Sequence, residues 1–213
     1  MIFDYIADLI IGFIFSIFFI SAGFVLALNF KTLYYNDINL LNIEQSSSLD
    51  NELIKDNYDS LVSYMQPNAK GDLILPNFTL SESATKHFYE IKNLYKIVYL
   101  LAAFSGLMCI VIIILKVRNA DHQFLFISSI IASLIPLAIL LGALTQFNTM
   151  FNRFCSYIFA DYDWQLSPTT DPVATILPNK FLQHSSIAIF SFAFICGLCL
   201  FVIWKGLKNK FEG

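Results

Sequence analysis

Residues 97–117 read IVYLLAAFSGLMCIVIIILKV, and this stretch decides the fold class. Its only charged residue is Lys116, one position before the end. A helix of roughly 20 apolar residues is long enough to cross the hydrocarbon core of a bilayer. A charged side chain at the centre of such a helix costs about 2.5–3.5 kcal/mol. An apolar run with an uncharged middle therefore predicts a transmembrane helix.

Three further stretches have the same character, at residues 9–28, 124–144 and 186–204. Of the 213 residues, 57% are hydrophobic and 14% are charged, whereas soluble domains carry about 25% charged residues. We therefore expect an all-α fold, a four-helix transmembrane bundle with two structured extracellular loops, forming a single membrane domain over residues 1–213. The uncharged spans argue against an ion or proton pathway, and the net charge of −3 argues against a nucleic-acid partner.

The first apolar stretch has to be distinguished from a cleaved signal peptide. A signal peptide has a basic start and an apolar core of about 7–15 residues. This chain begins instead with Asp4 and Asp8, and its apolar run is longer. We interpret the stretch as a retained membrane anchor.

Basic residues predict the orientation in the membrane. Lys116 and Arg118 flank the short link between the second and third spans, and three lysines follow the fourth span: Lys205, Lys208 and Lys210. The positive-inside rule places both groups in the cytoplasm. The two termini would then be cytoplasmic, and the loops at residues 30–96 and 145–184 would lie outside. We expect a multi-pass protein of the cell membrane with its site on the extracellular face.

The cysteines give little information about function. Cys109, Cys196 and Cys199 lie within predicted spans. The spacing of Cys196 and Cys199 resembles a redox or metal pair, but small-residue packing is the better interpretation in a membrane helix. No second set of ligands completes a metal site, so we expect no metal. Cys155 is the only cysteine in a loop.

The first external loop carries two predicted helices. Between Leu49 and Met65 apolar residues recur at helical spacing, which predicts an amphipathic helix on the membrane surface or on the bundle. Thr79 and Glu82 have the spacing of a capping box. This spacing predicts a helix that begins near Leu80 and continues into the second span.

His87 is the first candidate for chemistry. It lies about two turns before the second span, with Glu90 three residues later on the same helical face. A carboxylate in this position can orient an imidazole as a general base. A solvated surface pair has the same spacing, and spacing alone favours that simpler interpretation.

The second external loop is dense in aromatic residues. Phe147, Phe151, Phe154, Tyr157 and Phe159 fall within a short stretch. Such residues suit the membrane–water interface, and they also suit a pocket for acyl chains. An interfacial belt does not explain the close grouping of polar residues and a tryptophan that follows, namely Asp161, Asp163, Trp164 and Asp171.

Two stretches together resemble a known family. They are ESATKHFYEIK at residues 82–92 and FCSYIFADYDWQLSPTTDP at residues 154–172, with LPNKF following at 177–181. They are similar to motifs of the lipoprotein intramolecular transacylases of Gram-positive bacteria, called Lit. The family's second histidine is replaced here by Cys155, and one of its acidic residues by Ala84. The resemblance covers nearly the whole chain.

The resemblance implies a membrane acyltransferase that requires no metal and no other cofactor. Such an enzyme moves an acyl chain from the diacylglyceryl group of a bacterial lipoprotein to the α-amine of its N-terminal cysteine, producing the lyso form. His87 would be the base, with Glu90 orienting it. Lys92 could assist the oxyanion, although a lysine that extends to the interface is the simpler interpretation. Lys92 is also a candidate for substrate binding, together with Phe154, Asp161, Trp164 and Asp171. Membrane lipid and lipoproteins would be the partners.

Two alternatives stay open at this stage. Cys155 could form a covalent acyl carrier with His87, or it could be inert in a chain whose activity is lost or altered. The second is preferred, since a cysteine in the histidine's place needs a new mechanism. The whole chain could instead be a non-catalytic membrane protein that binds lipid or lipoprotein through its aromatic loop.

Overall fold

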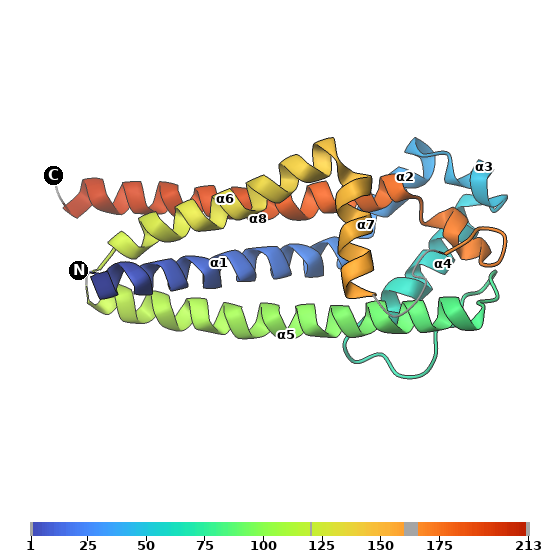
Figure 1. Cartoon of the computed structure of the whole chain (residues 1–213), viewed down its shortest axis with the longest axis horizontal. Helices are drawn as coiled ribbons and strands as arrows, with labels where there is room; N and C mark the ends of the chain where they lie inside the picture. The colour runs from blue at the N-terminus through green and yellow to red at the C-terminus, as the bar shows by residue number, and fades with distance from the viewer. Residues whose placement is uncertain (1, 120, 160–165, 212–213) are drawn as a thin grey trace. The chain divides into compact units, whose positions relative to one another are not determined.

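The computed structural model describes residues 2–119, 121–159 and 166–211, and within these ranges it contains helices and no strands. Figure 1 shows the helices in chain order. Their bounds are α1 (Ile2–Asn29), α2 (Thr32–Leu40), α3 (Ile43–Ser47), α4 (Asn51–Tyr64), α5 (Glu82–Arg118), α6 (Gln123–Thr145), α7 (Phe147–Ile158), the 3-10 helix η1 (Pro172–Ile176) and α8 (Asn179–Phe211). The all-α prediction is confirmed.

Four of these helices are long and apolar enough to cross a membrane, as predicted: α1, α5, α6 and α8. α5 has 37 residues and is therefore about 55 Å long, well beyond the roughly 30 Å of a hydrocarbon core. Its first turns carry several charged residues, whereas the residues from Ile97 onward are apolar. We take its spanning segment to begin at Ile97.

The chain forms two compact units, each assembled from separate segments. Unit 1 comprises Met1–Leu26, Val98–Gly142 and Ile187–Gly213, and unit 2 comprises Ala27–Ile97 and Ala143–Ser186. Unit 2 corresponds closely to the two predicted external loops at residues 30–96 and 145–184. The single membrane domain stays a prediction.

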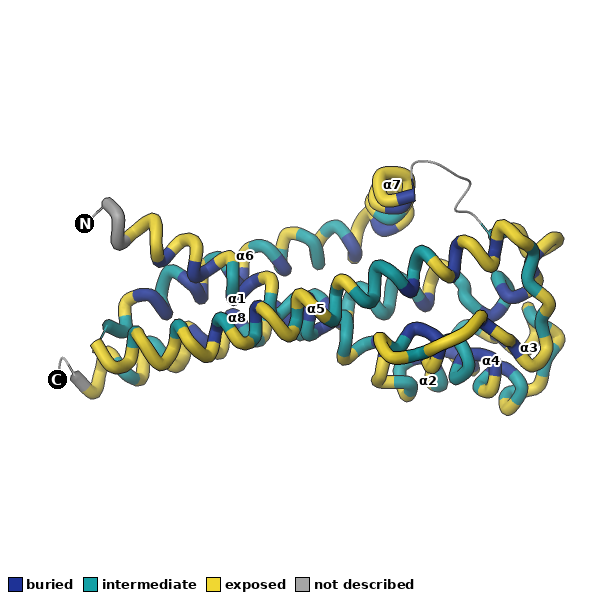
Figure 2. The backbone as a smooth tube through the Cα atoms, turned by 90° about the horizontal axis from the view of Figure 1, so that it is seen from below, coloured by how far each residue is buried: buried dark blue, intermediate teal, exposed yellow. Residues whose placement is uncertain are grey.

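Unit 1 is a helical bundle with a small buried core, and many residues of its helices are exposed (Figure 2). Phe15, Cys109, Phe124, Ala132 and Leu200 belong to its buried core. Large apolar side chains are also exposed on the outside of all four helices, including Phe13, Leu100, Phe104, Leu134 and Val202. An apolar exterior of this extent is typical of a surface in contact with lipid.

Helices α8 and α6 of unit 1 approach closely at Gly197. A Cβ atom added there would lie 2.7 Å from the backbone carbon and oxygen of Ala132 on α6 and 2.5 Å from Ser133 Oγ. Small residues of this kind allow membrane helices to approach closely. Gly197 lies between Cys196 and Cys199 and makes this contact, whereas Cys199 is exposed; the packing role of the two cysteines stays a prediction.

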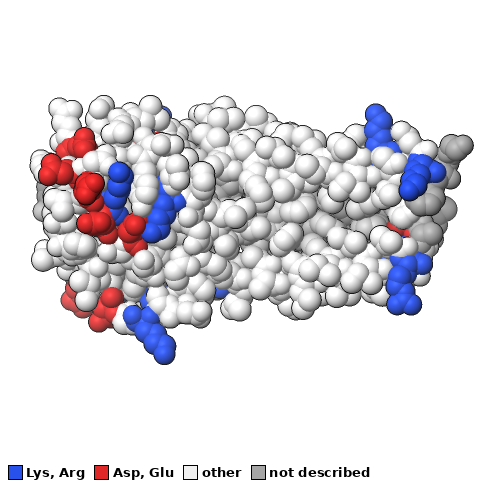
Figure 3. Space-filling model, turned by 180° about the vertical axis from the view of Figure 1, so that it is seen from behind, with Lys and Arg blue, Asp and Glu red and all other residues white. Residues whose placement is uncertain are grey.

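Charged residues gather at one end of unit 1 (Figure 3). Lys116 Nζ lies 2.8 Å from Asp8 Oδ1 and 2.7 Å from Asp121 Oδ2. Asp8 is buried, so Lys116 supplies the partner that a carboxylate in a membrane helix requires. Asp8, near the start of α1, is thus paired within the structure of unit 1.

Unit 2 has an aromatic core. The rings of Tyr34 and Tyr58 are stacked at 3.7 Å, and Phe181 packs edge-on against Tyr34 at 4.9 Å. Tyr34 Oη donates to the carbonyl of Ile176 at 2.7 Å. Helices α2, α4 and α8 and the segment η1 are held together by these contacts.

Two local features differ from the prediction. α5 is capped by Ser81 and not by Thr79, since Ala84 N–H donates to Ser81 Oγ at 3.1 Å and Thr85 N–H donates to Ser81 O at 2.9 Å. Helix α7, within the aromatic loop, was not predicted. The amphipathic helix expected over residues 49–65 is present as α4.

Candidate functional site

His87 occupies an enclosed, aromatic environment near the start of α5. Its side chain is buried, and its ring centroid lies 5.8 Å from that of Phe88 and 5.2 Å from that of Phe159. Nδ1 is buried, and within the described part of the chain no hydrogen bond reaches it. Burial lowers the pKa of the imidazole, because a buried charge loses its hydration. The neutral ring can therefore accept a proton near neutral pH.

Glu90 does not orient His87 in this structure. No hydrogen bond joins the two side chains among those made by the described residues, and Glu90 is half-buried. His87 and Glu90 have the expected spacing along α5, but their side chains are not joined by a hydrogen bond. The rings of Phe88 and Phe159 hold the imidazole in its place.

Lys92 is enclosed on a different face of α5 from His87. They are five positions apart, which corresponds to roughly 140° around a helix. The ammonium of Lys92 lies 3.9 Å from the ring centroid of Tyr64, a cation–π contact. Burial, together with the charge of Lys96, lowers the pKa of Lys92. Its role in binding substrate stays a prediction.

Helix α7 brings the second motif to His87. Phe159 caps α7, with its N–H donating to Cys155 O at 2.8 Å, and its ring packs against His87. Cys155 is buried, and burial raises the pKa of its thiol to about 11. A buried thiol with a raised pKa carries little thiolate at neutral pH, so this environment does not activate Cys155 as a nucleophile.

The remaining predicted residues have different environments. Phe154 is 57% exposed on α7. Asp161 and Trp164 lie outside the described residues, so the structure gives them no position.

Asp171 is hydrogen-bonded within the protein, and its role in binding substrate stays a prediction. It is buried, and its carboxylate accepts hydrogen bonds from Ser81 N–H at 3.0 Å, Ser81 Oγ at 3.0 Å and Thr170 Oγ1 at 3.2 Å. Ser81 caps α5. Asp171 therefore attaches the second external loop to the start of the helix that carries His87.

We expect Asp171→Ala to destabilise the protein. Each hydrogen bond to a charged group contributes about 1.5–3 kcal/mol, and the variant removes those to Ser81. Thermal unfolding in detergent should show a clearly lower midpoint. Asp72→Ala, at an exposed aspartate, is the matched control. Equal midpoints for the two variants would contradict the role assigned to Asp171.

Unit 2 contains a contact between His184 and Asp37 that no local sequence pattern indicates. His184 Nδ1 lies 3.0 and 2.9 Å from the two carboxylate oxygens of Asp37, and Asp37 is buried. The pair joins α2 to α8 across 147 positions of sequence. Neither spacing nor a motif connects residues so far apart, so only the fold reveals it.

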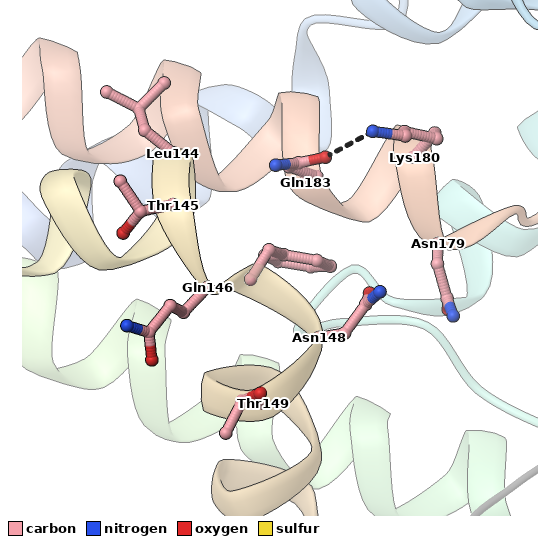
Figure 4. Close-up of a pocket in the computed structure, with 9 residues that line it drawn as sticks. Leu144, Thr145, Gln146, Asn148, Thr149, Asn179, Lys180 and Gln183 are labelled. Carbon is pink, nitrogen blue, oxygen red and sulfur yellow. Dashed lines mark hydrogen bonds between the residues drawn. The ribbon is translucent and has the colours of Figure 1, made fainter.

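A hollow of about 670 Å³ lies where α6 ends, α7 begins and α8 begins (Figure 4). It is lined mainly by polar side chains: Leu144, Thr145, Gln146, Phe147, Asn148, Thr149, Asn179, Lys180 and Gln183. Gln183 anchors this corner by donating to Ala143 O at 2.9 Å. His87 is not among the lining residues. Within the described residues, no group of three or more His, Cys, Asp or Glu side chains could hold a metal ion.

Comparison with known proteins identifies a family whose model matches residues 9–182, described as lipoprotein intramolecular transacylase Lit. The crystal structure of the membrane integral lipoprotein intramolecular transacylase Lit from Bacillus cereus is 25% identical, with a TM-score of 0.93. The match covers 98% of this chain and 97% of that chain. No curated protein sequence matches.

Two variants of the Bacillus cereus protein, with one histidine replaced by arginine or by alanine, are also similar. Each is 24% identical with a TM-score of 0.87, and the matches cover 98% of this chain and 93% and 94% of theirs. At this identity the likeness is evidence for the fold alone.

Proposed function

Because the chain belongs to the lipoprotein intramolecular transacylase (Lit) family, we propose that it moves an acyl chain within a bacterial lipoprotein. The donor is the diacylglyceryl group and the acceptor is the α-amine of the same N-terminal cysteine, so the product is a lyso-form lipoprotein. The chain is thus a membrane acyltransferase, an intramolecular transacylase, with lipoprotein as its substrate. The observation that carries this proposal is the buried Nδ1 of His87, with which no described residue forms a hydrogen bond.

The reaction needs one proton to move from the amine nitrogen to the glyceryl oxygen. As the amine nitrogen attacks the ester carbonyl carbon, a C–N bond forms and the nitrogen becomes more acidic. His87 takes this proton as a general base. When the C–O bond to the glyceryl oxygen breaks, the same imidazole returns the proton to that oxygen. One neutral histidine is sufficient for both steps, and no net proton is consumed.

An enclosed site supports this role. Phe88 and Phe159 pack on the His87 ring, and they exclude water that would otherwise hydrolyse the ester. Low polarity also favours an uncharged amine as the nucleophile. The substrate contributes its own lipid chains, which suit apolar surroundings.

We place the site on the extracellular side of the membrane, with both termini in the cytoplasm. The support is the position of the basic residues: Lys116 and Arg118 end α5, and Lys208 and Lys210 lie in the last turn of α8. Such residues favour the cytoplasmic side. His87 lies at the other end of α5 from Lys116 and Arg118.

Mass spectrometry of a lipoprotein's N-terminal peptide tests the proposed function. The peptide is taken from a bacterium that makes only the diacyl form, with and without this protein. An acyl chain on the α-amine, present only with the protein, supports the proposal. An unchanged peptide, with the protein folded in the membrane, would favour a protein that binds lipid or lipoprotein without catalysis.

Cys155 is expected to be dispensable for acyl transfer. Burial raises the pKa of its thiol to about 11, so little thiolate is present at neutral pH and the thiol is not activated as an acyl carrier. Cys155→Ala should therefore retain most of the N-acylated peptide. In a variant with Cys109, Cys196 and Cys199 replaced by serine, labelling of Cys155 by iodoacetamide should be slow at pH 8 and accelerate as the pH rises toward 11.

A covalent acyl enzyme gives the opposite result. Cys155→Ala would then lose all transfer while Cys155→Ser kept the fold, and the thiol would be labelled rapidly at pH 8. Either observation would restore Cys155 to the reaction.

A further inference from the structure

Helix α7 presents a stripe of large apolar side chains that the protein does not cover. Met150, Phe154 and Tyr157 are 37%, 57% and 86% exposed. Their spacing of four and three residues places them on one side of the helix. We call these three residues the α7 stripe.

The α7 stripe borders the face by which α7 joins unit 2. Phe147 and Cys155 are buried on that face, and Phe147 stacks on Phe151 at 5.2 Å. The remaining side of α7 is polar, with Asn148, Thr149, Asn152, Arg153 and Ser156. One part of the apolar side of α7 is therefore packed on the protein, and the adjoining part, the α7 stripe, is exposed among the described residues.

The place of α7 in the chain indicates what covers the α7 stripe. α6 is one of the four helices long and apolar enough to span a membrane, and it ends at Thr145, two residues before α7 begins. Leu141 and Leu144 near the end of α6 are each 53% exposed. Exposed apolar residues thus continue along the chain from the span into α7.

Charge on α7 is also suited to a lipid surface. Arg153 is its only charged residue; it is exposed and lies one turn before Tyr157. An arginine beside an apolar stripe can reach lipid phosphates while its neighbours enter the acyl region. Apolar and basic residues in this arrangement are typical of helices that lie in a membrane interface.

We propose that α7 lies in the outer interface of the bilayer, with the α7 stripe inserted among lipid acyl chains and Arg153 at the phosphate level. Phe154 is then a lipid contact. The opposite face of the same helix ends in Phe159, which packs on His87. The proposal concerns the placement of α7 and does not depend on acyl transfer.

Tryptophan fluorescence tests this placement. In a variant with Trp164→Phe and Trp204→Phe, a single tryptophan is introduced as Tyr157→Trp or Phe154→Trp, with Asn152→Trp on the polar face as the matched control. Each protein is reconstituted into nanodiscs of phosphatidylglycerol and phosphatidylcholine. Lipids brominated near the carbonyl end of the acyl chain serve as quenchers, and iodide is the quencher in water.

We expect brominated lipid to quench the tryptophans at positions 157 and 154 several-fold more than the one at position 152, and iodide to show the reverse order. Quenching of positions 157 and 154 by iodide alone would place the stripe in water. Protection from both quenchers would indicate cover by protein, such as a second copy. Either result overturns the proposal, and the two stripe positions report independently if one variant folds poorly.

Discussion

Replacing His87 by alanine is expected to stop N-acylation, so that the lipoprotein's N-terminal peptide stays in its diacyl form. His87 is the proposed carrier of the transferred proton, and its buried Nδ1 has no hydrogen-bond partner among the described residues. General acid–base catalysis contributes about 10²–10⁴-fold to a rate. A loss of that size reduces the product below detection in the mass spectrometric assay described above.

Three controls make this result specific. His87→Gln keeps a polar side chain of similar reach but cannot take the proton, so it should be as inactive as alanine. His122→Ala removes a histidine from the link between α5 and α6 and should keep activity. Glu90→Gln should also keep most of it, because among the described residues the imidazole donates no hydrogen bond to Glu90. Full transfer by a folded His87→Ala protein would rule out the proposed mechanism.

The four spans could be predicted because the bilayer imposes a strong rule on sequence. A stretch such as residues 97–117 has to be long and uncharged, and neighbours elsewhere in the fold do not change that requirement. The capping residue at the start of α5 was harder to predict. Thr79 and Ser81 are both acceptable caps by residue type, and it is Asp171, 90 positions away, that bonds Ser81.

The site could be predicted only in part, because it too depends on residues that are distant in the sequence. His87 could be recognised as a histidine beside a span. Its burial depends on Phe159 at the end of α7, and this helix was not predicted because the stretch is so rich in aromatic residues. The stretch Phe147–Ile158 satisfies both an interfacial belt and an amphipathic helix. The pair of Asp37 and His184 leaves no local pattern at all.

Gly197→Ala is expected to destabilise the bundle, although alanine is the better helix former. A Cβ at Gly197 would lie 2.7 Å from backbone atoms of Ala132, and a backbone cannot rotate away as Ser133 Oγ can. α6 and α8 would have to separate. Such overpacking costs about 1–3 kcal/mol or more, which exceeds the gain of about 1 kcal/mol in helix propensity. The midpoint of thermal unfolding in detergent should fall by several degrees.

The same substitution at Gly206 provides a matched control on the same helix. A Cβ added at Gly206 meets no atom within 4 Å, so only the propensity gain remains and Gly206→Ala should unfold at an equal or higher temperature than the parent. The two glycines thus predict shifts of opposite sign from one chemical change. A Gly197→Ala protein as stable as Gly206→Ala would mean that the contact with α6 is looser than this geometry requires. A bundle held by close backbone contact, and not by a large apolar core, depends on such positions because lipid competes for every apolar side chain.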